Sequence, residues 1–138
     1  MFKKWHRLMT RLRQGSATVK IEGRTLTVDE LSVVLAGTIR DWVVAGDVVV
    51  VVIDMETPEN VFGVSRKGAV VWQVPNLRSV EYEGQGMIGI TRGYYNVSAA
   101  DGHRVVLHGD DGEFVEVDAR TGTPLTNVAA SRRGRRPW

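Results

Sequence analysis

Residues 48–53 read VVVVVI, inside the longer stretch GDVVVVVIDMETPENVFGVSRKGAVVWQV that covers residues 46–74. A strand formed by this run has apolar side chains on both of its faces, because successive residues of a strand point to opposite sides. Such a strand is typical of the middle of a layered structure. We therefore expect Val49 and Val51 to face one layer, and Val48, Val50 and Val52 to face the other.

A plain two-sheet sandwich covers only one face of each strand, so a further layer has to cover this run. The sequence offers three candidates, which are an N-terminal helix through Trp5 and Leu8, the segment 28–37, and another subunit. Burial contributes roughly 1.5–3 kcal/mol for each large apolar side chain. A charge placed in this run, as in Val50→Asp, is therefore expected to give unfolded or insoluble protein.

Length and composition favour one domain that works inside the cell. A chain of 138 residues is close to the usual size of a single domain and can bury a sizeable core. The absence of cysteine excludes disulfides, a thiol nucleophile and thiolate metal ligands, and fits a reducing compartment. The N-terminus lacks the apolar block of a secretory signal, and no segment approaches the ~18 apolar residues of a membrane span. We expect a soluble, cytoplasmic protein.

Charge is divided unevenly along the chain, although the net charge is only +2. The two ends carry nine basic residues and no acid, whereas residues 14–130 carry nine basic residues against all 16 acidic ones. Basic ends therefore flank an acidic body. Such an asymmetry points to an acidic partner, which is nucleic acid, an anionic membrane or the acidic body of another copy. The predicted partner-binding residues are Lys3, Lys4, Arg7, Arg11, Arg13, Arg132, Arg133, Arg135, Arg136 and Trp138.

The first 14 residues have the pattern of an amphipathic helix that ends near Gly15. Phe2, Trp5, Leu8 and their helical neighbours form an apolar face, and the basic residues lie outside it. This helix is expected to pack on the protein's own sheet, on another subunit or, less favourably, on a membrane surface. The tail 128–138 ends in SRRGRRPW and is expected to be a flexible basic arm. Residues 15–127 are expected to form a single β domain.

From residue 18 the apolar period changes from helical to alternating, and glycine, proline or Asp/Asn groups separate short β-branched runs. The expected strands are 18–21, 24–28, 38–44, 48–54, 60–64, 69–74, 79–83, 87–91, 94–98, 104–108 and 113–118. The segment 28–37 is ambiguous. Thr27 with Glu30 resembles a capping box, and a short turn or helix is favoured there over a strand. The predicted fold is mainly β, a small antiparallel sandwich or barrel or a stack of blade-like sheets, with the N-terminal helix.

Three hairpins place a glycine at their tips, Gly23, Gly68 and Gly112, at intervals of 45 and 44 residues. A period in this range belongs to propeller-type blades, although tight hairpins also favour glycine by themselves. The segments NVFGVSRKGAVVWQV and RVVLHGDDGEFVEVDARTGTPL resemble the repeat of PQQ-type β-propellers, where an Asp-x-x-Thr-Gly turn follows the second strand. They are also similar to a small bacterial family with one WQV-type and one VDxxTG-type hairpin. Residues 118–122 match that turn, and its Asp is expected to cap backbone N–H groups while Gly122 takes positive φ.

The match departs from the repeat at residues 124–126, where Pro-Leu-Thr stands in place of the docking tryptophan. Two or three units are also too few to close a propeller, so the resemblance implies no quinone cofactor. No other cofactor or metal is expected, because His103 and His108 lie on opposite faces of one predicted strand and cannot share a metal. The GQGMIG run at 84–89 precedes a strand pattern and not a phosphate-binding helix.

No set of residues in the sequence indicates an active site. We therefore expect a non-enzymatic protein-interaction or assembly module, a structural or accessory protein of a bacterium or phage, with a protein partner or a second copy as its ligand. The alternative hypothesis is a nucleic-acid-binding protein that uses both basic ends. The acidic body disfavours this alternative, because it would repel the DNA that the ends are meant to hold.

Overall fold

The computed structural model describes residues 18–75, 80–82, 86–88, 93–109 and 114–125. The predicted helix 1–14 and the tail 128–138 lie outside these residues. The described part consists of antiparallel strands and turns, without a helix, as the mainly β prediction requires. The strands are β1 (Val19–Glu22), β2 (Thr25–Val28), β3 (Leu31–Val34), β4 (Ile39–Ala45), β5 (Val48–Ile53), β6 (Val61–Ser65), β7 (Val70–Gln73), β8 (Val80–Tyr82), β9 (Gly86–Ile88), β10 (Asn96–Ala99), β11 (Arg104–His108) and β12 (Phe114–Asp118).

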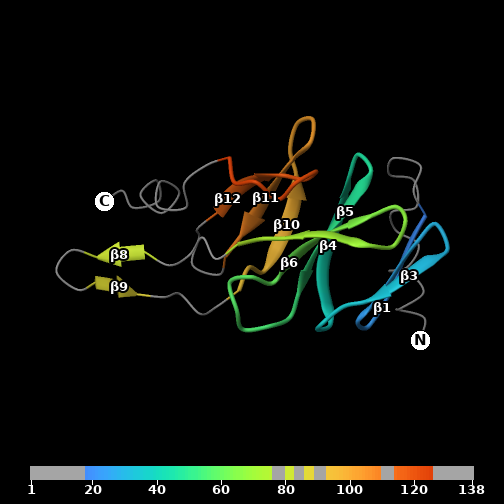
Figure 1. Cartoon of the computed structure of the whole chain (residues 1–138), viewed down its shortest axis with the longest axis horizontal. Helices are drawn as coiled ribbons and strands as arrows, with labels where there is room; N and C mark the ends of the chain where they lie inside the picture. Colours follow the sequence, from blue (N-terminus) through green and yellow to red (C-terminus); the bar gives the residue numbers. More distant parts are fainter. Residues whose placement is uncertain (1–17, 76–79, 83–85, 89–92, 110–113, 126–138) are drawn as a thin grey trace.

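These strands form three main sheets that follow one another along the chain (Figure 1). The N-terminal sheet has the order β1-β2-β3, the central sheet β4-β5-β6-β7 and the C-terminal sheet β10-β11-β12. Strands β8 and β9 pair with each other as a two-stranded hairpin. Neighbouring strands are joined by short hairpins, so each sheet is a meander built from consecutive residues.

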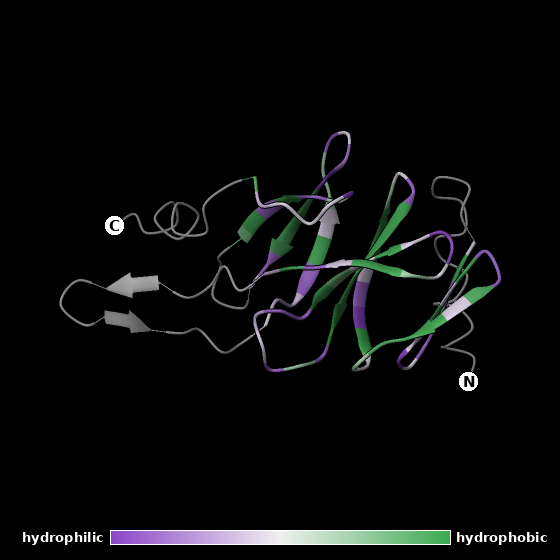
Figure 2. Ribbon diagram, in the orientation of Figure 1, coloured by the Kyte–Doolittle hydropathy of each residue, from purple (hydrophilic) through white to green (hydrophobic). Residues whose placement is uncertain are grey.

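The central strand β5 is buried on both faces, as the VVVVVI run predicts. Val48, Val50 and Val52 belong to the core between the central and C-terminal sheets. Val49, Val51 and Ile53 belong to a second core between the central and N-terminal sheets. The three sheets are therefore stacked face to face, and Figure 2 shows hydrophobic residues concentrated along the strands at the middle of this stack.

The N-terminal sheet is the layer that covers the second face of β5. Val19, Leu26 and Val28 have no exposed surface and pack against Val49 and Val51. Leu35, which lies in the ambiguous segment 28–37, joins the same core. Of the three candidate covers, the structure thus uses segment 28–37 together with the two strands that precede it.

The preference for a turn or helix in segment 28–37 was wrong, because residues 31–34 form β3. Thr27 and Glu30 do not build a capping box. Asp29 and Glu30 instead form the two-residue turn between β2 and β3, with φ values of 48° and 77°. Thr27 Oγ1 lies 2.8 Å from Ser32 Oγ on the opposite strand, so this hydroxyl ties two strands together. The left-handed turn gives the strand twist that a tight hairpin needs.

The remaining predicted strands are all present, with small shifts at their ends. Gly23 and Gly68 lie at the tips of the β1–β2 and β6–β7 hairpins with φ of 62° and 77°, and Gly112 lies outside the described residues. Two of the three predicted hairpin glycines are thus confirmed, 45 residues apart, in the N-terminal and central sheets. The finer assignment of these hairpins to PQQ-type repeats stays a prediction.

We expect Val50→Asp to abolish folding, because its carboxylate would enter a fully buried site between two sheets. The cost of such a charge rivals the ~5–15 kcal/mol by which a typical domain is stable. The matched control is Val34→Asp, since Val34 is 60% exposed and the change there should cost about 1 kcal/mol or less. Thermal unfolding followed by circular dichroism compares the two. A Val50→Asp protein that unfolds as cooperatively as Val34→Asp would contradict the stacked arrangement.

Candidate functional site

All ten predicted partner-binding residues lie in segments 1–17 and 126–138, which are outside the described residues. Their role therefore stays a prediction. The described residues show instead the surfaces that such basic ends could meet, and the contacts that hold these surfaces in shape.

The described residues are acidic overall, with seven Lys or Arg residues against twelve Asp or Glu residues. Four of the seven basic residues, which are all arginines, form ion pairs within the body. Several acids project from the turns, as shown by the 89% and 95% exposed side chains of Asp47 and Asp101. Glu56 and Glu59 are exposed on the loop between β5 and β6. The body thus presents negative charge chiefly on its loops.

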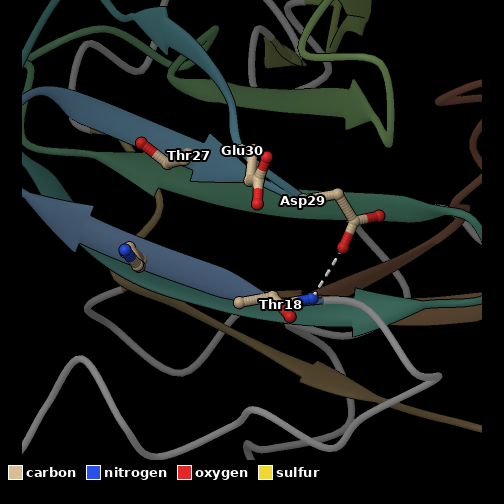
Figure 3. A pocket seen from close by; sticks show the side chains of 5 residues that line it. Thr18, Thr27, Asp29 and Glu30 are labelled. Atoms are coloured by element: carbon tan, nitrogen blue, oxygen red, sulfur yellow. Dashed lines mark hydrogen bonds between the residues drawn. The ribbon is translucent and has the colours of Figure 1, made fainter.

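The turn between β2 and β3 borders a hollow on the N-terminal sheet, lined by Thr18, Lys20, Thr27, Asp29 and Glu30 (Figure 3). Asp29 Oδ1 accepts a hydrogen bond of 2.9 Å from the Thr18 N–H, and Asp29 Oδ2 pairs with Arg66 at 2.8 Å. The Thr18 N–H bond, followed by the Arg66 bond, lowers the pKa of Asp29. Both oxygens of Asp29 are therefore committed to holding the turn.

A buried amide joins the central sheet to the strand that opens the C-terminal sheet. Asn60 has no exposed surface, and its Nδ2 donates to the carbonyls of Ile53 at 2.8 Å and Tyr94 at 3.0 Å. Asn60 Oδ1 accepts from the Tyr94 N–H at 2.9 Å. A Cβ on Gly93 would lie 2.5 Å from the Asn60 amide, so only glycine allows this close approach. The loop between β5 and β6 is thereby fixed in place.

Two charged residues of β4 strengthen the same junction. Asp41 Oδ2 accepts a hydrogen bond of 2.9 Å from the Val97 N–H of β10. Arg40 pairs with Asp54 at 2.6 Å and stacks over the Tyr95 ring at 4.6 Å from its centroid. These contacts hold the first strands of two successive sheets side by side (Figure 1). The junction consists of hydrogen bonds and an ion pair between defined partners, in contrast to the apolar cores on either side of β5.

Trp72 adds a further polar contact between the central and C-terminal sheets. Its indole N–H donates to the Ala119 carbonyl at 2.7 Å, and the side chain is buried against the C-terminal core. A Cβ on Gly63 would overlap the indole ring, and one on Gly122 would lie 2.6 Å from it. The ring is thus enclosed between two glycines, one from each sheet. The PQQ-type repeat places a docking tryptophan after the Asp-x-x-Thr-Gly turn, whereas in this chain the tryptophan that contacts the turn comes from the preceding sheet.

The Asp-x-x-Thr-Gly turn itself has the predicted form. Asp118 Oδ1 accepts a hydrogen bond of 2.9 Å from the Arg120 N–H, and Gly122 has φ of 78°. The Arg120 side chain also donates to both carboxylate oxygens of Asp118. The side-chain bond and then the backbone bond from Arg120 lower the pKa of Asp118 to about 2. Asp118 is therefore ionised at neutral pH and closes the turn that receives Trp72.

A serine and a histidine whose proximity the sequence does not predict meet on the outer face of the C-terminal sheet. Ser98 Oγ lies 3.1 Å from His108 Nε2, from β10 and β11 respectively. The His108 ring lies 6.4 Å from that of Phe114 on β12. Among the described residues, no carboxylate bonds to the other ring nitrogen, which a catalytic serine–histidine pair requires for orientation. The pair is consistent with a surface hydrogen bond.

No three His, Asp or Glu side chains in the described part of the chain gather closely enough to hold a metal ion. His103 lies before β11, where it faces Gly46 of the β4–β5 turn, and His108 lies at the end of β11. Within the same residues, no helix has the length and apolar character to cross a membrane.

Comparison with known proteins identifies a family for this chain and a solved structure with a similar fold. A family model described as a domain of unknown function (DUF7957) matches residues 16–129. No match is found among curated proteins. Among solved structures, the fold is similar to that of BamB from Moraxella catarrhalis, a PQQ-like β-propeller protein, with a TM-score of 0.54 and 24% identity. The similarity covers 80% of this chain and 32% of that one, so the chain spans about a third of the length of BamB.

The enclosure of Trp72 can be tested with Gly63→Ala. The added methyl group would overlap the indole, so we expect a loss of about 2–4 kcal/mol in the free energy of unfolding. The same change made in a Trp72→Leu background should cost less, because the ring it strikes is gone. Denaturant unfolding of the four proteins gives an expected coupling of about 1–3 kcal/mol. Strictly additive losses would show that Gly63 and Trp72 do not depend on each other.

Proposed function

This chain belongs to the DUF7957 family, and we propose that it is a non-enzymatic protein-interaction module that assembles through its basic ends. The observation that carries the proposal is the division of charge. The described body holds a surplus of acids, and the nine basic residues of the two ends stand outside it in the sequence.

The acids of the body are available to a basic partner because of where they lie. Asp47 and Asp101 project from turns between strands and are almost fully exposed, and each makes only a long ion pair, with Arg66 at 4.0 Å and with Arg104 at 3.9 Å. Four of the five arginines in the described body pair with acids of the fold, such as Asp29 and Asp54. A basic segment that approaches the body therefore meets a surface with a surplus of acids, most of whose arginines are already paired. Electrostatic attraction of this kind steers association and is weakened by salt.

The proposed partner-binding residues are the nine basic ones and Trp138, and the proposed partner is a second copy of the chain. A basic end of one copy would contact the acidic turns of the next. The non-enzymatic part of the proposal is supported by the Ser98–His108 geometry, which lacks an orienting carboxylate among the described residues. A cytoplasmic location is proposed on the absence of cysteine alone.

The test is the solution mass of the full chain by light scattering at about 20 mM and about 1 M NaCl. We expect at least twice the 15.3 kDa of one chain at low salt and a shift toward the monomer at high salt. A variant with the nine basic residues changed to Gln should be monomeric at low salt. The matched control changes three body cations, Lys20, Arg24 and Lys67, to Gln and should still assemble.

Two results would contradict the proposal. A monomer at low salt would rule out charge-driven assembly. A monomer with a high ratio of absorbance at 260 to 280 nm, which falls to that of pure protein at high salt, would instead favour nucleic-acid binding by the same residues.

A further inference from the structure

The turn between β10 and β11 carries an aspartate whose side chain the fold leaves almost unconstrained. The Asp101 side chain is 95% exposed, and its ion pair with Arg104 spans 3.9 Å. Four other aspartates of the described residues are held by contacts of 2.9 Å or less, namely Asp29, Asp41, Asp54 and Asp118. The Asp101 carboxyl group can therefore rotate about its side-chain bonds, whereas those four cannot without losing a close partner.

The residue after Asp101 is a glycine, so the neighbouring main-chain nitrogen is uncrowded. Gly102 has φ of 61°, and nothing lies within 4 Å of the position that a Cβ would take there. Its N–H donates to no acceptor in the described part of the chain. Asp101 is also the only described aspartate that precedes a glycine. The similarly exposed Asp47 precedes Val48 of β5, whose branched side chain shields its nitrogen.

We propose that Asp101–Gly102 is a site of spontaneous covalent modification, at which aspartate isomerises to isoaspartate without an enzyme. The Gly102 nitrogen attacks the side-chain carbonyl carbon of the neutral Asp101 carboxyl group and forms a C–N bond. The nitrogen gives up its proton, and the carboxyl hydroxyl leaves as water. The product is a five-membered succinimide ring.

Water then opens this ring at one of its two carbonyl carbons. Cleavage on the side-chain carbonyl restores aspartate. Cleavage on the main-chain carbonyl gives isoaspartate, in which the chain runs through the former side chain of Asp101. One water leaves and one returns, so the final product has the mass of the original protein.

The turn opposes ring closure only weakly. Closure requires rotation about the Asp101 Cα–C bond, which brings the Gly102 nitrogen over the side-chain carboxyl carbon. The hydrogen bond that resists this rotation runs from the Arg104 N–H to the Asp101 carbonyl at 3.1 Å. Both residues are exposed, and a water-exposed hydrogen bond contributes little net stability. The absence of a side chain at Gly102 leaves the rotation sterically open.

Isomerisation would change a turn that the sheets use for packing. The main chain gains one methylene group, and the former Asp101 carbonyl oxygen becomes part of a carboxylate, so the Arg104 N–H loses its acceptor in the turn. The next residue, His103, accepts a hydrogen bond of 2.7 Å from the Ala119 N–H, and its ring faces Gly46 of the β4–β5 turn. We therefore expect the modified protein to unfold at a lower temperature than the fresh protein.

This modification is independent of the proposed assembly. Isoaspartate keeps one carboxylate, so the surplus of acids on the body does not change. The reaction needs only water, so it proceeds in a monomer and in an oligomer alike.

The test is peptide mapping of the full chain after storage in warm, mildly acidic buffer. Trypsin releases Asp101 in residues 93–104, and the Asp111–Gly112 pair separately in residues 105–120. Isoaspartate changes the retention of a peptide but not its mass, the succinimide lowers the mass by one water, and fragmentation locates the site. We expect isoaspartate to form at least about tenfold faster at Asp101 than at each of the five other described aspartates.

A synthetic peptide of residues 93–104 provides the reference for the effect of the fold. We expect Asp101 in the folded chain to react at no less than about a tenth of the rate in the peptide, because the turn is exposed and loosely held. A folded chain that reacts more slowly than this, or no faster at Asp101 than at the other described aspartates, would overturn the proposal.

The matched control is Asp101→Glu, which keeps the charge but would have to form a six-membered ring. We expect no isomerisation at residue 101 of this variant. Its unfolding temperature should fall less on storage than that of the unmodified sequence. An equal fall in the two proteins would assign the loss of stability to another site and contradict the role of Asp101.

Discussion

Burial of β5 on both faces is the constraint on which the rest of the structure depends. A strand of six apolar residues is unfavourable when either face meets water, so each face needs a covering layer, and in this protein both layers are sheets. This requirement explains why the chain builds a third sheet from residues 19–34, although two sheets would suffice for an ordinary sandwich. The central sheet also contributes side chains to both cores. A substitution in β5 that disturbs packing is therefore expected to weaken both contacts between sheets.

The two contacts between sheets are made by different interactions. The N-terminal sheet is held mainly by apolar packing and the Arg66–Asp29 ion pair. The C-terminal sheet is fixed in addition by buried hydrogen bonds from Asn60, Asp41 and Trp72, which specify one orientation.

The sequence was most informative where a local pattern had only one physical solution. The valine run of β5 and the Asp118 turn were predicted residue by residue, because alternation and turn chemistry are local. Strand β3 was missed because Asp29 and Glu30 take positive φ without glycine, and Asp29 is held there by Thr18 and Arg66, which are distant in sequence. The Trp72 contact was missed for the same reason, since Gly63 and Ala119 approach it only after the sheets stack. The basic ends were evident from the charges in the sequence. Their partner was not, because it depends on surfaces that form only after folding and that the pattern of residues along the chain does not reveal.

Native-state hydrogen exchange tests the central role of β5 most directly. Strands β2, β5, β6 and β11 are all hydrogen-bonded on both edges. Of these, β5 and β6 are covered on both faces by sheets of the described chain, and only β5 has all of its residues buried. We predict that the amides of Val49 to Val52 exchange slowest among the described residues, at least about tenfold more slowly than those of β2 and β11, at low protein concentration. Exchange of β5 at the rate of β2 and β11, or faster, would contradict a stack organised around this strand.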